Sequence, residues 1–262
     1  MLLAIDIGNT NIVVALFKND TIDSVWRMAS DVRRTADEYT SILASLLRER
    51  DIGEDSINRA VLSSVVPDLT GPCIRMAQNL CGIRPLLVSP DLYHKLPVRL
   101  PDGASHEIGT DLVCNAVAAW TLTRSANVVV DFGTALSFTI TDQTGAIRGV
   151  DIAPGLGTAV HSLSSGTAQL PTVPLKAPPS SIGTNTIQSI QAGIVLGYKG
   201  LVEYLIGQIK KDLHALTGVE ENDVRVVATG GLNSVLGPIT DVFTCVDKDL
   251  TLKGLKLIAD VC

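Results

Sequence analysis

Two short turns in this sequence each place an aspartate, a glycine and polar side chains directly after an apolar run. The first is Asp6-Ile-Gly8-Asn-Thr10-Asn11 and the second is Asp131-Phe-Gly133-Thr134. Glycine lets backbone N–H groups approach a phosphate closely. Asp6 would repel a phosphate unless Mg²⁺, or water on Mg²⁺, lay between them. Either turn alone is typical of a plain hairpin, but two matched turns favour binding of a nucleoside triphosphate.

A third group of residues could handle a proton. Glu107-Ile-Gly109-Thr-Asp111 precedes an apolar stretch with helical spacing over residues 112–122. Asp111 could be a general base beside a substrate hydroxyl, because phosphoryl transfer needs a carboxylate that orients or accepts that proton. It could equally be a helix N-cap, which the spacing alone favours. Asn115 lies on the same helix face and either orients Asp111 or packs.

Other nucleotide-binding motifs are absent or ambiguous. No G-x-x-x-x-G-K-[ST] segment occurs, which excludes a P-loop. Gly155-Leu-Gly157 lacks the third glycine of a dinucleotide fingerprint. Thr229-Gly230-Gly231 suits close contact with a nucleotide, and a plain strand-to-helix turn is equally consistent with it.

The elements that must position these residues repeat along the chain. In the first half, apolar runs and turn residues predict three strands, a helix, a strand, a helix and a short strand. Their expected ranges are 2–5, 12–17, 21–26, 36–50, 59–65, 69–81 and 85–88. In the second half we expect strands at 127–130, 136–141, 146–152 and 224–228, and helices at 157–165, 186–216 and 250–261.

The two halves open alike. Asp6 and Asp131 each follow a strand, and they lie about half the chain apart. This pattern predicts an α/β protein with an internal duplication. The predicted halves are residues 1–124, with the first turn and Asp111, and residues 125–262, with the second turn.

Composition narrows the classes of partner. The 262 residues carry 21 basic and 27 acidic side chains, a formal net charge of −6. No basic surplus is available for a nucleic acid or an anionic membrane, so we expect neither partner. The five cysteines are odd in number and form no C-x-x-C pair, which favours a reducing, cytoplasmic setting.

Four segments together resemble the type III pantothenate kinases of the acetate and sugar kinase/Hsc70/actin superfamily. They are residues 6–13, 130–135, 182–193 and 228–231, which occur in the family's order over nearly the whole chain. The resemblance implies two ribonuclease-H-like (actin-like ATPase) halves with mixed five-stranded sheets. It also implies ATP-dependent phosphorylation of pantothenate to 4′-phosphopantothenate, the first step of coenzyme A biosynthesis, by a cytoplasmic homodimer.

The resemblance assigns roles residue by residue. It makes Asp111 the proton acceptor and Asp131 the ligand of a monovalent cation, K⁺ or NH₄⁺. Asp6 would meet Mg²⁺ through the ATP phosphates. The implied ATP contacts are Asp6, Ile7, Gly8, Asn9, Thr10, Asn11, Ile12, Val13 and Thr134. The implied pantothenate contacts are Gly109, Thr110, Asp111, Leu112 and Thr186.

The acceptor side departs from the family pattern in two places. The family has Gly-Ala-Asp-Arg where this chain has Gly109-Thr110-Asp111-Leu112, and a tyrosine where it has Asp102. A lost charged hydrogen bond of about 1.5–3 kcal/mol would weaken binding by about 10- to 150-fold, unless Arg99 or His106 compensates. Two alternatives therefore stay open: a kinase of the same fold for another small hydroxyl compound, and a non-catalytic, nucleotide-binding regulatory relative.

Overall fold

The computed structural model describes residues 1–101, 103 and 106–262, which form two compact units. The first unit is Met1–Ala118 with Leu250–Cys262, and the second is Ala119–Asp249. The first break lies close to the predicted boundary at 124/125. The C-terminal helix differs from the prediction, because it packs with the first unit and not with the half that precedes it in sequence.

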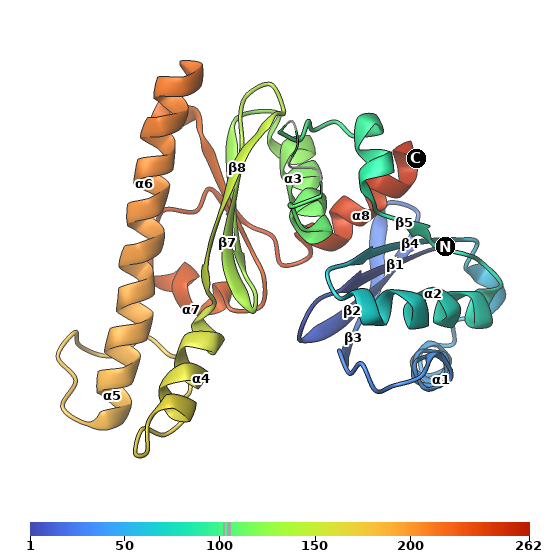
Figure 1. Ribbon diagram of the computed structural model, residues 1–262, viewed down its shortest axis with the longest axis horizontal. Helices are drawn as coiled ribbons and strands as arrows, with labels where there is room; N and C mark the ends of the chain where they lie inside the picture. Colours follow the sequence, from blue (N-terminus) through green and yellow to red (C-terminus); the bar gives the residue numbers. More distant parts are fainter. Residues whose placement is uncertain (102, 104–105) are drawn as a thin grey trace. The chain divides into compact units, whose positions relative to one another are not determined.

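The first unit is built on a five-stranded mixed sheet with strand order β3-β2-β1-β4-β5 (Figure 1). Strands β1, β2 and β3 form an antiparallel meander, while β4 and β5 run parallel to β1. The strands are β1 Leu2–Ile7, β2 Asn11–Lys18, β3 Thr21–Ala29, β4 Arg59–Ser64 and β5 Leu86–Leu87. The helices are α1 Ala36–Arg48, α2 Pro67–Cys81, α3 Thr110–Thr123, which runs on into the second unit, and α8 Leu250–Val261, with 3-10 turns at Glu54–Ser56 and Pro90–Lys95.

Local signals explain where α1 and α2 begin and end. Thr35 and Glu38 form a capping box at the start of α1, in which each side chain satisfies the other residue's backbone N–H. Pro67 occupies the first turn of α2, where its missing N–H costs nothing. Gly82 ends α2 in the left-handed conformation, with φ of 69°. These boundaries follow directly from residue type.

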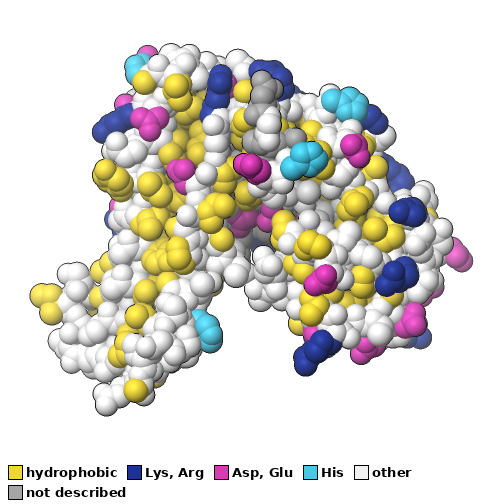
Figure 2. Space-filling model, viewed as in Figure 1, with side chains coloured by type: hydrophobic (Ala, Val, Ile, Leu, Met, Phe, Trp, Pro, Cys, Tyr) yellow, Lys and Arg dark blue, Asp and Glu magenta, His cyan; other side chains and the backbone are white. Residues whose placement is uncertain are grey.

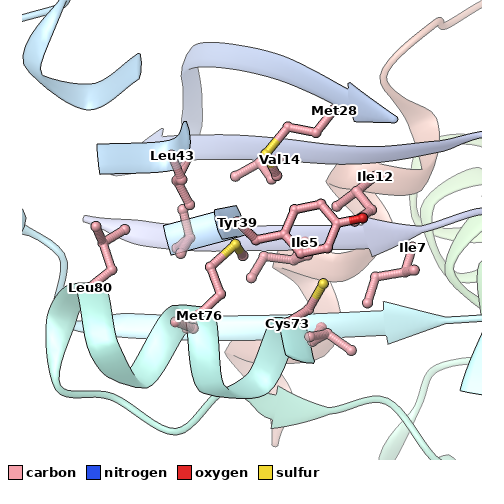
Figure 3. Close-up of a cluster of buried hydrophobic side chains, with 14 of the residues drawn as sticks. Ile5, Ile7, Ile12, Val14, Met28, Tyr39, Leu43, Cys73, Met76 and Leu80 are labelled. Carbon is pink, nitrogen blue, oxygen red and sulfur yellow. The ribbon is translucent and has the colours of Figure 1, made fainter. Parts of the chain in front are cut away.

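The main core of the first unit lies between the sheet and these two helices (Figure 3). Tyr39 and Leu43 of α1 and Met76 of α2 are fully buried against sheet residues such as Ile5 and Val14. Within each of the two helices the buried residues recur at spacings of three and four, which places them on one face of that helix. Burial of this apolar surface is what holds the helices to the sheet.

The C-terminal helix α8 packs against β1 and β4, and it also lies on α3. A Cβ at Gly254 would overlap the Cys114 carbonyl oxygen and lie 2.9 Å from Cys114 Cα, so the backbones approach as only glycine permits. Thr251 Oγ1 donates to Asn115 Oδ1 at 2.8 Å, and Lys256 Nζ lies 2.8 Å from Asp20 Oδ1. This close packing explains why the C-terminal helix belongs to the same unit as the N-terminal sheet.

The second unit has the same sheet order, β10-β9-β6-β7-β8, with a meander followed by parallel strands (Figure 1). The predicted duplication is therefore confirmed at the level of topology. Its strands are β6 Asn127–Phe132, β7 Ala135–Thr141, β8 Ile147–Pro154, β9 Arg225–Thr229 and β10 Cys245–Val246. Its helices are α4 Leu156–Gly166, α5 Thr186–Gln191, α6 Gly197–Thr217 and α7 Asn233–Leu236, with 3-10 turns at Glu221–Asp223 and Gly237–Ile239.

The long helix of the second unit differs from the uninterrupted helix predicted at 186–216. A π-helical segment, Ala192–Leu196, separates α5 from α6. One turn here is wider because it holds an extra residue, a common feature near functional sites. Beyond it, Val202, Ile206 and Leu213 of α6 pack on Val128 and the rest of the sheet core.

Most predicted strands and helices are confirmed, with ends that shift by a few residues. The short β10, α7 and the 3-10 turns were not predicted, because segments of two to six residues are too short to show a period. Within the part of the chain that the structure describes, no helix is both long and apolar enough to cross a bilayer.

Candidate active site

Asp6 and Asp131 occupy equivalent places in the two units. Each is the second-last residue of the first strand of its sheet, directly before the glycine-containing turn. On the parallel neighbour strand, Ser63 stands in register with Asp6, and Thr229 stands in register with Asp131. Both hydroxyl residues are buried. Sequence reasoning did not find Ser63, because its place beside Asp6 comes from sheet register.

The first turn is held open towards solvent by three hydrogen bonds. Gly8 N donates to Asn11 O at 3.0 Å within the turn. Ser30, which follows β3, holds the turn with two more hydrogen bonds: its Oγ donates to Gly8 O at 2.6 Å and its N donates to Thr10 O at 3.0 Å. Asn9, Thr10 and Asn11 are exposed. Polar groups on a fixed, exposed turn suit a phosphate-bearing ligand.

The apolar residues of the predicted ATP loop point elsewhere. Ile7 and Ile12 are fully buried in the core beneath the sheet (Figure 3), and Val13 is half-buried opposite Asp6. Only the backbone of Ile7 and Ile12 is therefore available to a ligand. Their side chains fix the position of the turn.

Two glycines from elsewhere in the second unit, Gly155 and Gly230, pack against the second turn. Thr134 O accepts hydrogen bonds from Gly155 N at 3.0 Å and from Thr158 Oγ1 at 2.7 Å. A Cβ at Gly155 would overlap Gly133 O and lie 2.6 Å from Thr134 O. Gly230 has φ of 85°, and a Cβ there would lie 2.6 Å from Asp131 Oδ1. These glycines let the ends of β6, β8 and β9 meet at Asp131 and Thr134.

Asp111 is the second residue of α3, inside the first turn of the helix. It therefore does not hold the cap position that its spacing suggested. Its Oδ1 accepts a hydrogen bond from Leu112 N at 2.8 Å. Burial raises the pKa of Asp111 above its ordinary value, and backbone hydrogen bonds only partly oppose this. A carboxylate of raised basicity is suited to accept a proton.

Thr110 fastens the start of α3 to the end of β4. Its Oγ1 lies 2.9 Å from Ser63 Oγ, accepts from Ser64 N at 3.2 Å and lies 3.2 Å from Ser64 O. The Thr110 hydroxyl thus faces β4 and not a ligand. Thr70 of α2 extends the network by donating to Ser64 Oγ at 2.8 Å.

Cys114 links the two carboxylates of the first unit. Burial raises its pKa well above the ordinary value, and the negative charges of Asp6 and Asp111 add to this, while a hydrogen bond with Ser63 opposes it. The thiol is fully buried and stays protonated. Asp6, Ser63, Thr110, Asp111 and Cys114 therefore form one cluster, assembled from β1, β4 and α3.

Thr186 lies in the second unit, at the start of α5, apart from this cluster in sequence. It is exposed and lines a cavity of about 580 Å³ between α4, the preceding loop and α5. Asn185 caps the helix, its Oδ1 accepting from Gln188 N at 3.0 Å. The predicted acceptor contacts Gly109–Leu112 and Thr186 thus belong to different units.

Two further predictions concern Asp102 and metal ligands. Asp102 lies outside the described residues. Among residues 1–101, 103 and 106–262, no group of three or more His, Cys, Asp or Glu side chains is arranged to hold a metal ion.

Comparison with known proteins gives a family match. A model of the family "type III pantothenate kinase" matches residues 2–208. The type III pantothenate kinase of Treponema pallidum is 43% identical, covering 98% of this chain and 93% of that protein. Those of Moorella thermoacetica and Geobacter sulfurreducens are 40% and 37% identical, each covering 98% of both chains.

Solved structures agree on the fold. A proposed Baf-family transcriptional activator from Campylobacter jejuni matches with a TM-score of 0.55 at 18% identity, covering 98% of this chain and 97% of that chain. A proposed 2-dehydro-3-deoxygalactonokinase from Sinorhizobium meliloti matches with a TM-score of 0.54 at 11% identity, covering 99% and 96%. At these identities the likeness concerns the fold alone. It accords with the two mixed five-stranded sheets of this chain.

Proposed function

The chain belongs to the type III pantothenate kinase family, and from this premise we propose that Asp111 accepts the proton of the pantothenate hydroxyl during transfer. The chain is an ATP-dependent pantothenate kinase of coenzyme A biosynthesis. The observation that carries the assignment of Asp111 is its burial in the first turn of α3, where its pKa is raised. A general base of this kind contributes about 10²- to 10⁴-fold to a rate.

The two glycine turns hold the ATP phosphates in this proposal. The first turn contributes the backbone of residues 6–13 and the exposed side chains of Asn9, Thr10 and Asn11. The second contributes Thr134, which is exposed in the turn between β6 and β7. Asp6 meets Mg²⁺ on the phosphates, because Mg²⁺ in kinases is typically held by one or two carboxylates together with substrate phosphates.

Asp131 is proposed as the ligand of a monovalent cation, K⁺ or NH₄⁺. The carboxylate oxygens of Asp131 suit a hard cation, and Asp131 Oδ1 lies beside two glycines, at distances of 2.6 Å and 3.8 Å from where the Cβ atoms of residues 230 and 133 would stand. Gly230 brings the backbone after β9 close to Asp131 Oδ1, which a side chain at that position would block. When bound, the cation supplies positive charge beside the phosphates.

Gly109, Thr110, Asp111 and Leu112 are proposed to line the pantothenate side of the site, together with Thr186 of the second unit. Thr110 acts through its backbone, since its hydroxyl is bonded to β4. Leu112 is half-buried and apolar, so it offers packing and no charge. The pantothenate carboxylate must therefore be neutralised by another group, and Arg99 and His106 are both exposed candidates.

We also propose a homodimer in the cytoplasm. Hydrophobic residues gather on the visible surface of the second unit (Figure 2). The large apolar side chains that this unit exposes include Ile152, Ile182, Ile187, Tyr204 and Leu216, all at least 49% exposed. A second copy of the chain would cover apolar surface of this kind. All five cysteines are free thiols, which supports a reducing compartment.

The deciding experiment measures ATP turnover by the purified protein with Mg²⁺ and K⁺, with and without pantothenate. We expect 4′-phosphopantothenate, identified by mass, only in the complete mixture. Omission of pantothenate is the control for ATP hydrolysis. ATP binding without pantothenate-dependent product would contradict the proposed function.

A further inference from the structure

Tyr93 lies at the edge of the first sheet where the candidate site is formed. Strands β1, β4 and β5 are parallel, so their carboxyl ends meet at one edge, the usual place for a ligand in such sheets. Asp6 and Ser63 stand near the ends of β1 and β4. The 3-10 turn Pro90–Lys95, which carries Tyr93, follows directly after β5.

The Tyr93 hydroxyl is buried, and among the described residues it has no hydrogen-bond partner. The side chain is only 8% exposed. Protein interiors rarely leave such a group unsatisfied, because its desolvation is not repaid. Tyr39, the other buried tyrosine of this unit, shows the contrast: its hydroxyl accepts from Asp31 N at 3.0 Å and donates to a backbone carbonyl such as Ala29 O at 3.1 Å.

The unsatisfied hydroxyl stands within electrostatic range of Asp111. Burial raises the pKa of Tyr93 to about 12, and the neighbouring Cys114 and Asp111 add to this. Tyr93 therefore stays protonated at neutral pH and has an O–H to donate. Close to Asp111, the Thr110 hydroxyl is bonded to β4 and Leu112 has no polar group, so neither supplies this donor.

We propose that Tyr93 is a substrate-binding residue, whose hydroxyl donates a hydrogen bond to a hydroxyl or carbonyl oxygen of the pantothenate molecule held beside Asp111. This inference rests on the proposed function. The bound acceptor supplies the partner that the described residues do not. Tyr93 thereby helps to select an acceptor that carries an oxygen at this place.

Tyr93→Phe tests the assignment, because it removes the hydroxyl and keeps the ring. We expect the KM for pantothenate to rise about 5- to 100-fold, the range for an unmet hydrogen bond in a buried site. The KM for ATP stays within about twofold and the Tm does not fall, because no internal hydrogen bond is lost.

Tyr39→Phe is the matched control. It removes a hydroxyl that is satisfied within the protein, so the Tm falls while the KM for pantothenate is unchanged. If Tyr93→Phe behaves like this control, or leaves all parameters at the wild-type level, Tyr93 does not bind the acceptor. Failure of the wild type to phosphorylate pantothenate would instead overturn the proposed function, and this assignment with it.

Discussion

At the scale of single residues, the candidate site contains a carboxylate that folding places where its charged form is unfavourable. Asp111 is largely shielded from water, and its negative charge is not balanced by a nearby cation among the groups that shift its pKa. The cost to stability is the counterpart of its basicity, because both follow from the same desolvation. Asp142 is the opposite case. Its side chain is fully buried, yet it accepts from Thr144 Oγ1 at 2.6 Å and pairs with Arg148 at 2.6 Å.

The first prediction concerns Asp111→Asn. We expect the rate of 4′-phosphopantothenate formation to fall by about 10²- to 10⁴-fold, because the amide cannot accept the proton. The Tm should stay level or rise, because a buried charge is removed. Product rate by mass spectrometry and Tm by calorimetry check both parts.

Asp142→Asn is the control for that variant. It loses an ion pair and hydrogen bonds in the turn between β7 and β8, so we expect a lower Tm and wild-type kinetics. Near wild-type turnover by Asp111→Asn would remove Asp111 from the role of base.

The second prediction is that Asp111 and Asp142 make stability depend on pH in opposite directions, because the pKa of Asp111 is raised and that of Asp142 is lowered. The pKa of Asp111 is raised, so kcat/KM should fall on the acid side through a pKa above 3.8. Burial opposes ionisation of Asp142, but hydrogen bonds from Thr144, Ala146 and Arg148 outweigh it and lower its pKa below 3.8.

Stability follows the same signs. The contribution of Asp142 is present above pH 3.8 and is lost as pH falls through its lower folded pKa. That of Asp111 is present below pH 3.8 and is lost as pH rises through its higher folded pKa. Rate profiles and melting curves across pH 3–8 measure both. A rate profile without an acid limb above pH 3.8 would argue against Asp111 as the base.

At the scale of elements, the two turns take their conformations because neighbouring segments come unusually close. In the second unit, the end of β8 touches the turn between β6 and β7 through Gly155. In the first, Ser30 after β3 holds the turn between β1 and β2. The turn conformations therefore depend on contacts with a third strand in each case.

The third prediction tests that contact with Gly155→Ala. The added methyl meets the backbone oxygens of Gly133 and Thr134, which cannot give way cheaply, so we expect a loss of about 1–3 kcal/mol in stability. Affinity for ATP, measured by calorimetry, should fall by about tenfold or more as the second turn shifts. Gly157→Ala is the control, because its Cβ meets only Leu232 Cδ1 at 3.8 Å. Equal ATP affinity in the two variants would contradict this role of the turn.

At the scale of the whole molecule, the chain is a duplication whose last helix returns to the first unit. The two sheets share one strand order. In each sheet the first strand carries an aspartate near its end, and a buried hydroxyl residue stands in register with it on the parallel neighbour strand. The return of α8 makes the unit that carries Asp111 discontinuous in sequence. Its stability therefore depends on both ends of the chain.

The fourth prediction follows from that arrangement. Deletion of residues 250–262 should unfold the first unit and abolish turnover, although it removes no residue assigned to ATP or pantothenate. Gly254→Ala should lower stability by about 1–3 kcal/mol through its clash with the Cys114 backbone. Gly207→Ala in α6 has open space and should not be destabilising. Thermal melts compare the variants, and an unchanged Tm for Gly254→Ala would disprove the tight contact.

Much of the fold was predictable from local signals. Apolar periodicity, caps and glycine turns predicted nearly every long strand and helix, and the repeat of Asp6 and Asp131 predicted the duplication. The π-helical segment after Gln191 was not predictable, because one extra residue in a turn hardly changes an apolar pattern. For the candidate site, spacing alone favoured a cap for Asp111, and the burial that raises its pKa came only from the tertiary structure.

The sequence by itself determined the elements, the two aspartate turns and the order in which they occur, because turn chemistry and periodicity act over a few residues. Tertiary structure alone decided which distant residues meet. Sheet register placed Ser63 beside Asp6, chain direction brought Tyr93 to the edge where the parallel strands end, and close packing joined α8 to the first unit. These contacts depend on how buried surfaces fit together over long separations, and no local spacing encodes that fit.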